Sequence, residues 1–305
     1  GHPIDRDKPR TKRQARSVDG GHTWTIETPT FLDDQGNDRP AVEPKGGLDF
    51  THPDFALAFR MEGSNQGFST FCYSNDRAHK FGRKGIFART DYIVNGKHDL
   101  LAFLTAAKDE GGEGWPFCAR TTNGGKSWRI VGWIGPQPGP GGYAIMPTTL
   151  RLKNGSLLSI IRRRGQSEEG DRWWLEAFLS PNDGKSWYML EKPRLPNRGN
   201  PAHMIRLSDG RIALTYGWRD EPYGVRAMLS HDEGVNWGGE FVLRDDGESW
   251  DLGYPRTVQR ADGKCVTVYY FNDNSGKERY IAATIWDPGP PPSQTAAIGT
   301  ATKPK

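Results

Sequence analysis

The 305-residue sequence lacks long apolar runs, clustered cysteines and a large excess of charge of either sign. No apolar run approaches the ~18 residues that a membrane-spanning helix needs, and no signal-peptide pattern opens the chain. The net charge is +4, and no basic run interleaved with aromatic residues is typical of a nucleic-acid groove. We therefore expect no membrane span and no nucleic-acid partner.

Cysteine is rare as well. Cys72, Cys118 and Cys265 are widely spaced and form no metal-ligand cluster, so buried free thiols are the favoured interpretation, with one disulfide left open. No His/Asp cluster has the spacing of a metal site, and we expect neither a metal nor another cofactor. The chain does not begin with Met; a removed leader would favour a secreted or periplasmic protein, and the compartment stays open.

Glycine, tryptophan and one short pattern are abundant. There are 38 Gly and 11 Trp, which suits short strands and tight turns better than helices. The pattern Ser/Thr-x-Asp/Asn-x-Gly-x-Ser/Thr/Asn-Trp occurs as SVDGGHTW from Ser17, TTNGGKSW from Thr121, SPNDGKSW from Ser180 and SHDEGVNW from Ser230. Four copies indicate a repeated structural unit.

The spacing of the copies predicts the architecture. The starts at 121, 180 and 230 are 59 and 50 residues apart, whereas 104 residues separate the starts at 17 and 121. A degenerate copy in which Ala78 replaces Gly and Phe81 replaces Trp fills that gap, starting at Ser74. A period of about 50 residues is typical of β-propellers and related arrays.

A second set of turns runs in phase with the first. Asn-Gly or Asp-Gly pairs occur between β-rich runs at Asn95-Gly96, Asn154-Gly155, Asp209-Gly210 and Asp262-Gly263. Two turns per period predict four strands per blade; around residue 210 we expect strands at 202–207, 211–216 and 224–229, with a fourth after residue 237. The eight-residue pattern then forms the turn between the third and fourth strands. Its polar side chains accept from turn backbone, its Gly allows positive φ and its Trp packs between blades.

The eight-residue turn resembles the Asp box of the sialidase superfamily. The stretch GYPRTVQRADGKCVTVYY, Gly253 to Tyr270, is similar to the closing segment of sialidases. The resemblance covers about residues 14 to 287 and implies an all-β, six-bladed propeller of four-stranded antiparallel blades, or seven blades in a longer parent. We expect one propeller domain over residues 1–288, a disordered tail over 289–305 and a monomer.

Both ends of the propeller are expected to be incomplete. Residues 10–24 are interpreted as a third strand running into its turn, and the last blade as stopping after a third strand at 279–286. The chain is then a fragment or processed form, unless residues 1–12 close the ring. The Phe/Tyr-Arg-Ile-Pro motif of early sialidase blades is absent.

Arginine is the notable residue type on the face where sialidases have their site. That face carries the links between blades and the loops between second and third strands, and the hairpin turns lie on the other face. A guanidinium can hold both oxygens of a sugar carboxylate. The candidate substrate-binding residues are Arg162, Arg164, Arg219, Arg226 and Arg256. Arg219 also resembles one member of the sialidase arginine triad.

Tyr254 matches the tyrosine nucleophile of sialidases. A phenol has a pKa near 10, so it needs a base or nearby cations to react at neutral pH. In sialidases a Glu supplies this help, but here the matching stretch contains Asn200-Pro201 and no Glu. His203 is a candidate base in its place, and Asp251 is a candidate acid/base group.

Two other functions stay open. Propellers of similar appearance are lyases that remove the C5 proton of a uronic acid with Tyr or His, and Tyr143 with His203 and the arginines could do so. A non-catalytic glycan-binding propeller is the third possibility. The leading prediction is exo-sialidase-type hydrolysis of an acidic oligosaccharide or polysaccharide.

Overall fold

The computed structural model describes residues 13–28, 32–37, 46–53, 55, 58–62, 68–73, 77–81, 86–108, 114–167, 170–190, 200–273 and 279–291. For residues 58–62, 68–73, 77–81, 86–90, 166–167 and 170–171 only the backbone is described. Every regular element in these ranges is a β-strand, and none of them contains a helix long and apolar enough to cross a membrane.

The strands form six antiparallel sheets, each from consecutive segments. The first two sheets are β1 (Gln14–Arg16) and β2 (Thr25–Glu27), then β3 (Ala58–Glu62), β4 (Phe68–Tyr73) and β5 (Arg77–Phe81). Two four-stranded sheets follow, β6 (Ile86–Gly96), β7 (Asp99–Ala106), β8 (Trp115–Thr121) and β9 (Arg129–Trp133), then β10 (Tyr143–Arg151), β11 (Leu157–Ser167), β12 (Gly170–Ser180) and β13 (Tyr188–Met189). The last two are β14 (Ala202–Arg206), β15 (Ile212–Trp218), β16 (Tyr223–Ser230) and β17 (Gly238–Gly247), then β18 (Gly253–Gln259), β19 (Cys265–Phe271) and β20 (Tyr280–Trp286).

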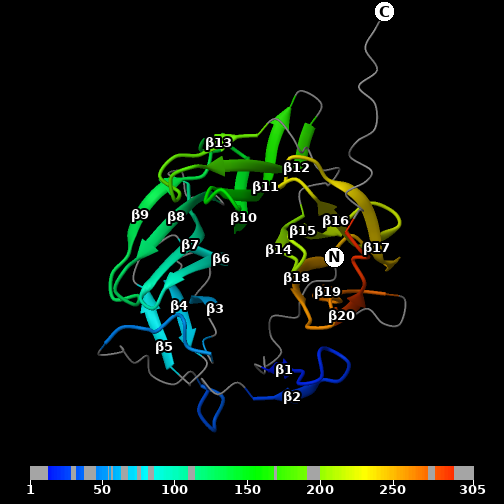
Figure 1. Cartoon of the computed structure of the whole chain (residues 1–305), viewed down its shortest axis with the longest axis horizontal. Helices are drawn as coiled ribbons and strands as arrows, with labels where there is room; N and C mark the ends of the chain where they lie inside the picture. Colours follow the sequence, from blue (N-terminus) through cyan, green and yellow to red (C-terminus); the bar gives the residue numbers. More distant parts are fainter. Residues whose placement is uncertain are drawn as a thin grey trace, which may run out of the picture.

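The sheets are arranged around a central axis as in a β-propeller, and the sheet β1–β2 lies beside the last sheet (Figure 1). Three sheets have the four strands of a complete blade and β18–β20 has three, so four blades follow one another over residues 86–286. The prediction of an all-β propeller is confirmed. The prediction of six four-stranded blades is too high for the described residues, because β3–β5 has three short strands and β1–β2 has two.

The blade used for the strand predictions has the expected order. β14, β15, β16 and β17 pair with their sequence neighbours, and the strand bounds differ from the predicted ones by at most two residues. The last blade ends with β20 among the described residues, as predicted. Arg211 holds the chain beyond it, because its guanidinium donates to the carbonyls of Pro288 and Gly289. The predictions for residues 1–12 and for the tail beyond 291 lie outside the described residues.

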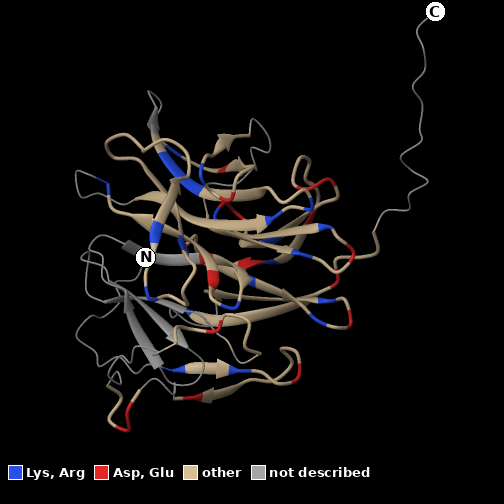
Figure 2. Ribbon diagram, turned by 60° about the vertical axis from the view of Figure 1, so that its left-hand side comes forward, with Lys and Arg blue, Asp and Glu red and all other residues tan. Residues whose placement is uncertain are grey.

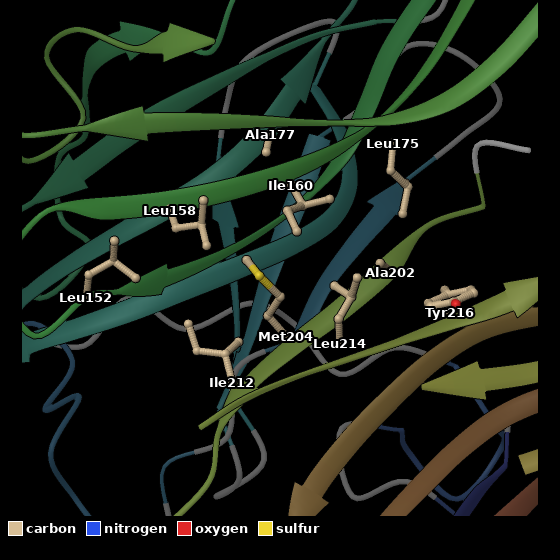
Figure 3. Close-up of a cluster of buried hydrophobic side chains, with 10 residues drawn as sticks. All are labelled: Leu152, Leu158, Ile160, Leu175, Ala177, Ala202, Met204, Ile212, Leu214 and Tyr216. Carbon is tan, nitrogen blue, oxygen red and sulfur yellow. The ribbon is translucent and has the colours of Figure 1, made fainter. Parts of the chain in front are cut away.

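Apolar side chains fill the space between adjacent blades (Figure 3). In one such layer Leu158, Ile160 and Leu175 of one blade pack against Met204 and Leu214 of the next. Strands in the middle of a blade are therefore buried on both faces; six of the seven residues of β15 are buried. This explains why these strands appear in the sequence as continuous apolar runs rather than as an alternation.

The four Asp-box copies form one repeated hydrogen-bond network. The Gly N–H donates to the Ser or Thr Oγ of the same copy at 2.8 to 2.9 Å, and the Trp Nε1–H donates to the Gly carbonyl at 3.0 to 3.1 Å. The copies from Thr121, Ser180 and Ser230 lie between the third and fourth strands of their sheets, as predicted, and the copy from Ser17 lies between β1 and β2 of a two-stranded sheet. The network satisfies part of the turn backbone from within each copy. In the copy from Thr121, Gly124 also donates its N–H to the His98 carbonyl and accepts from Leu48 N–H.

The degenerate fifth copy has a different structure from the one predicted. Arg77 to Phe81 form β5 and pair with β4 in continuous register, with Tyr73 opposite Arg77. Residues 77–81 are therefore the third strand of the sheet β3–β5 and not part of an eight-residue turn. Without the Gly at position 78 and the Trp at position 81, the chain continues as a regular strand.

Charged residues at the turns pair within the molecule. Asp183 and Glu233, at the fourth position of two Asp boxes, bind Arg151 and Arg206 at 2.7 Å. Figure 2 shows acidic residues at turns along one edge of the molecule, with basic residues beside them. Cys118 and Cys265 are buried free thiols, as favoured above, and the side chain of Cys72 lies outside the described residues.

Candidate functional site

Two blades approach closely at the point where the candidate site begins. A Cβ on Gly217 of β15 would lie 3.0 Å from the Cα of Gly253 on β18, so only glycine permits this contact. Arg219 follows the first glycine by two residues and Tyr254 follows the second by one. The glycine pair therefore brings a predicted carboxylate-binding residue beside the predicted nucleophile.

Tyr254 has a left-handed backbone conformation, with φ of 54°. It lies in a β-bulge, because the pairing of β18 with β19 shifts between Gly253 and Arg256. A bulky residue in this region costs of order 1 kcal/mol or more, and such conformations concentrate at functional sites. The bulge redirects the phenol away from the regular strand alternation.

Arg219 is held between two aromatic rings. Its Nε and Nη2 donate to the Leu252 carbonyl at 3.1 and 3.0 Å, and Nη2 also donates to the Tyr270 hydroxyl at 2.9 Å. The guanidinium carbon lies 5.4 Å from the ring centre of Trp250 and 5.7 Å from that of Tyr254. These contacts hold the cation in place before any ligand binds.

Asp251 is part of the same network. It accepts a hydrogen bond of 2.8 Å from the Tyr270 hydroxyl and pairs with Arg279 Nε at 2.5 Å. Burial raises the pKa of Tyr270; Arg219 lowers it, and the hydrogen bond to Asp251 raises it further. Tyr270 therefore stays protonated at neutral pH, donating to Asp251 and accepting from Arg219.

Arg162 reaches the site from another blade. Its Nη1 lies 3.4 Å from the Tyr254 hydroxyl oxygen, and its guanidinium carbon lies 5.2 Å from the ring centre of Tyr143. Tyr143 is only 8% exposed, so Arg162 packs against a buried ring. The structure thus brings together five of the nine predicted residues, namely Tyr254, Asp251, Tyr143, Arg162 and Arg219.

The first strands of neighbouring blades are linked by side-chain to backbone hydrogen bonds. Asp91 Oδ2 accepts from Thr149 N–H at 2.9 Å, Thr148 Oγ1 accepts from Met204 N–H at 2.9 Å, and His203 Nδ1 accepts from Thr257 N–H at 3.0 Å. Each acceptor belongs to one blade and each donor to the next. The bonds hold four first strands in fixed relative positions.

Burial and the bond from Thr257 together determine the charge and the tautomer of His203. Burial lowers its pKa to about 4, with Asp91 raising it and Arg256 lowering it, so the imidazole is neutral at pH 7. Because Nδ1 accepts from a backbone N–H, the neutral ring carries its proton on Nε2. In this arrangement His203 is a hydrogen-bond donor, and the predicted base role would require the Thr257 bond to break. Arg256, two residues beyond Tyr254, is exposed.

The two remaining arginines lie in other environments. Arg226 pairs with Glu240 at 2.7 Å, and its guanidinium carbon lies 4.1 Å from the ring centre of Trp218. Arg164 lies over the ring of Trp173 at 5.6 Å. Arg162 and Arg164 lie within β11 rather than in a loop, because β11 continues to Ser167 and pairs with β12 to the end.

Sequence reasoning missed four members of the network. Tyr270 and Arg279 complete the contacts of Asp251, Trp250 flanks Arg219, and Asp91 lies near His203. The only sequence signal was the position of Tyr270 at the end of the closing segment that contains Tyr254. Of the loops and links predicted for this face at 83–89, 108–115, 195–203 and 271–277, residues 83–85, 109–113, 195–199 and 274–277 lie outside the described residues.

A cavity of about 400 Å³ lies away from this site, among the hairpin turns of two neighbouring blades. Its lining includes Arg120, Arg151 and Asp183, and these charges pair with one another or with Asp99. No group of three or more His, Cys, Asp or Glu side chains in the described part of the chain is arranged to hold a metal ion.

Comparison with solved structures shows the fold of the chain in other proteins. A protein of unknown function from Dyadobacter fermentans is 20% identical, with a TM-score of 0.59, over 82% of this chain and 71% of that chain. A thermostable family-43 glycoside hydrolase is 12% identical, with a TM-score of 0.47, over 81% of this chain and 93% of that chain. A GH43_1 enzyme from Xanthomonas citri complexed with xylotriose is 12% identical, with a TM-score of 0.46, over 66% of this chain and 73% of that chain. At these identities the likeness concerns the fold alone.

No curated protein matches the chain. The BNR repeat-like domain matches residues 98–267, which is more than half of the sequence and includes three of the four Asp boxes and the whole of β7 to β17. The chain belongs to the BNR repeat-like domain family.

Proposed function

We propose that the protein is an enzyme that acts on a glycan carrying a carboxylated sugar, with Tyr254 as the reactive group. The observation that carries this proposal is the position of the Tyr254 phenol, 3.4 Å from Arg162 Nη1 and beside the Arg219 guanidinium. Two cations from different blades can hold a sugar carboxylate and stabilise negative charge on the phenol oxygen.

The first candidate reaction is sialidase-type hydrolysis. Tyr254 would lose its phenol proton to water and attack the anomeric carbon, while the bond to the aglycone breaks and the aglycone oxygen takes a proton from water. A second water would then cleave the tyrosyl–sugar bond, which releases the sugar and returns a proton to the phenol. The strained backbone of Tyr254 and the prepositioned Arg219 support a site in which attack geometry is fixed in advance. The cation pair selects for an acidic sugar over a neutral one.

The second candidate is elimination on a uronic acid, and the state of Asp251 favours it. Both oxygens of Asp251 are engaged, by Tyr270 and by Arg279, so the predicted acid/base carboxylate is not available to protonate a leaving group without breaking these bonds. In elimination the Tyr254 phenolate would remove the C5 proton while Arg162 and Arg219 neutralise the carboxylate, and the C4–O bond would break as its oxygen takes that proton from the phenol.

Product analysis separates the two reactions. The protein is incubated with sialyllactose and with rhamnose-glucuronate oligosaccharides, and products are followed by mass spectrometry and by the ultraviolet absorbance of an unsaturated uronate. Hydrolysis releases intact sialic acid, and elimination gives the absorbing product. Tyr254→Phe should reduce either activity by about 10³-fold or more.

Tyr188→Phe is the matched control, because Tyr188 is 60% exposed on β13 beside an Asp box and away from the site. It should retain full activity. Binding of the acidic sugar without turnover would leave a glycan-binding propeller as the function, and equal activity of Tyr254→Phe and the unmodified protein would contradict the role of Tyr254.

A further inference from the structure

Trp250 is unusually exposed for a tryptophan in a well-anchored segment. Half of its surface is accessible to solvent, although Leu252, two residues later, is completely buried. Among the tryptophans outside the Asp boxes, the next most exposed are Trp173 at 38% and Trp133 at 36%, and the latter stacks on Trp115 with ring centroids 4.1 Å apart. An apolar ring left open beside a polar site is a feature of ligand-binding surfaces.

The loop that carries Trp250 is fixed on both sides by Asn272, which is 3% exposed. Its side-chain oxygen accepts from Ser249 N–H at 2.8 Å, and its amide nitrogen donates to the Asp251 carbonyl at 2.7 Å. The Leu252 carbonyl is held in turn by Arg219. The backbone on both sides of Trp250 is therefore anchored.

The Trp250 indole contacts the Arg219 guanidinium. The Arg219 guanidinium lies over the ring at 5.4 Å, and the same guanidinium lies 5.7 Å from the Tyr254 ring. Arg219 is thus shared between the reactive tyrosine and Trp250. A sugar bound at Tyr254 with its carboxylate on Arg219 has its neighbouring sugar within reach of the open indole surface.

We propose that Trp250 is a stacking platform for a second sugar ring, so that the substrate is an oligosaccharide whose acidic residue lies at Tyr254 and whose neighbour lies on Trp250. This inference rests on the proposed function of the same site. The apolar C–H face of a pyranose packs on an aromatic ring, and its hydroxyl groups remain available to water at the open rim. Trp250 is then a specificity residue, which affects longer ligands more than the single acidic sugar, because the Leu252 carbonyl and the Tyr270 hydroxyl still hold Arg219 when the indole is removed.

The test compares ligand length. Binding is measured by isothermal titration on Tyr254→Phe, which keeps the ligand intact, with sialic acid against sialyllactose and with glucuronate against rhamnose-glucuronate oligosaccharides. Turnover is measured on the protein with Tyr254. Trp250→Ala should weaken binding of the longer ligand about tenfold or more and change binding of the monosaccharide less than about twofold. Trp250→Phe should retain most of the length-dependent gain.

Trp173→Ala is the matched control. Trp173 is 38% exposed, belongs to the same end of the blades and also lies under an arginine, but it is on the β11–β12 hairpin. It should leave both ligands unaffected. Equal losses for short and long ligands in Trp250→Ala, or a loss in Trp173→Ala as large as in Trp250→Ala, would overturn the platform while turnover of the parent still supported the proposed function. Absence of both binding and turnover in the parent would overturn the proposed function and the platform with it.

Discussion

The two ends of the blades differ in how regularly their side-chain contacts repeat. At the turn end, four Asp boxes repeat one network with nearly identical distances, and the tryptophan of each donates to a glycine carbonyl in its own turn. At the other end the described aromatic contacts differ from one another: Trp115 stacks on Trp133, Arg226 lies over Trp218 and Arg219 lies over Trp250. The repeated contacts of the turn end therefore stabilise the propeller, and the varied contacts of the other end determine what it can bind.

The comparison predicts that substitutions at the turn end lower stability without changing ligand binding. It also predicts that substitutions at the other end change binding at small cost in stability. Each of the four predictions below tests this division, and they are ordered by the size of the expected effect.

Gly184→Ala should have the largest effect. Gly184 has φ of 84°, and an added Cβ would lie 2.7 Å from Cys118 Sγ in the neighbouring blade. Backbone strain and overpacking together should lower the free energy of unfolding by about 4 kcal/mol, measured by urea denaturation. Gly155→Ala is the control: its φ is 87° and nothing lies within 4 Å, so it should lose only about 1 kcal/mol. Equal losses would show that the contact between blades contributes nothing.

The burial of His203 should make stability depend on pH. The unfolded imidazole binds a proton near pH 6.5, whereas burial lowers the folded pKa to about 4. Between these values the unfolded chain binds more protons, so the free energy of unfolding should decrease as the pH falls from 6.5 to 4, by at most about 3 kcal/mol.

Unfolding by urea across this pH range measures the effect. His203→Gln keeps a hydrogen-bond acceptor for Thr257 and removes the titration, so the difference between the two proteins isolates His203 from Asp91 and the other carboxylates. Parallel curves for the two proteins would contradict the prediction.

Arg219→Gln should separate binding from stability at the other end. Loss of the guanidinium removes the carboxylate partner, and kcat/KM for an acidic substrate should fall about 100-fold, equivalent to about 2.7 kcal/mol. The lost hydrogen bonds to Leu252 and Tyr270 should reduce stability by only about 1 kcal/mol, because solvent can reach the site. Arg226→Gln is the control, since Arg226 pairs with Glu240 and should leave kcat/KM unchanged. A larger change in stability than in kcat/KM would make Arg219 a structural residue.

The same division explains what the sequence could and could not predict. Strand order and the Asp-box turns follow from local patterns, because Ser230, Asp232 and Gly234 satisfy one another within eight residues. The position of Tyr254 near Arg219 follows from propeller topology.

The engagement of Asp251 could not be predicted. It depends on the β18 bulge and on Arg279, which precedes β20 after a long connection. Likewise, the pairing of Arg226 with Glu240 depends on register shifts between β16 and β17 that no local pattern specifies. Predictions were therefore reliable for repeated local structure and incomplete for side chains that meet across irregular strands.

The smallest predicted effect lies within the turn end and tests whether identical networks contribute equally. Ser230 and Ser17 each accept from the Gly N–H of their own Asp box at 2.8 Å. Ser230 is 1% exposed, so Ser230→Ala leaves a buried N–H without a partner and should cost about 1–2 kcal/mol. Ser17 is partly exposed, and water can replace its hydroxyl, so Ser17→Ala should cost about 0.5 kcal/mol or less. Urea denaturation of both variants measures the difference. Equal costs would mean that the contribution of an Asp box comes from its own geometry; the expected inequality means that it comes from the neighbouring blade that excludes water.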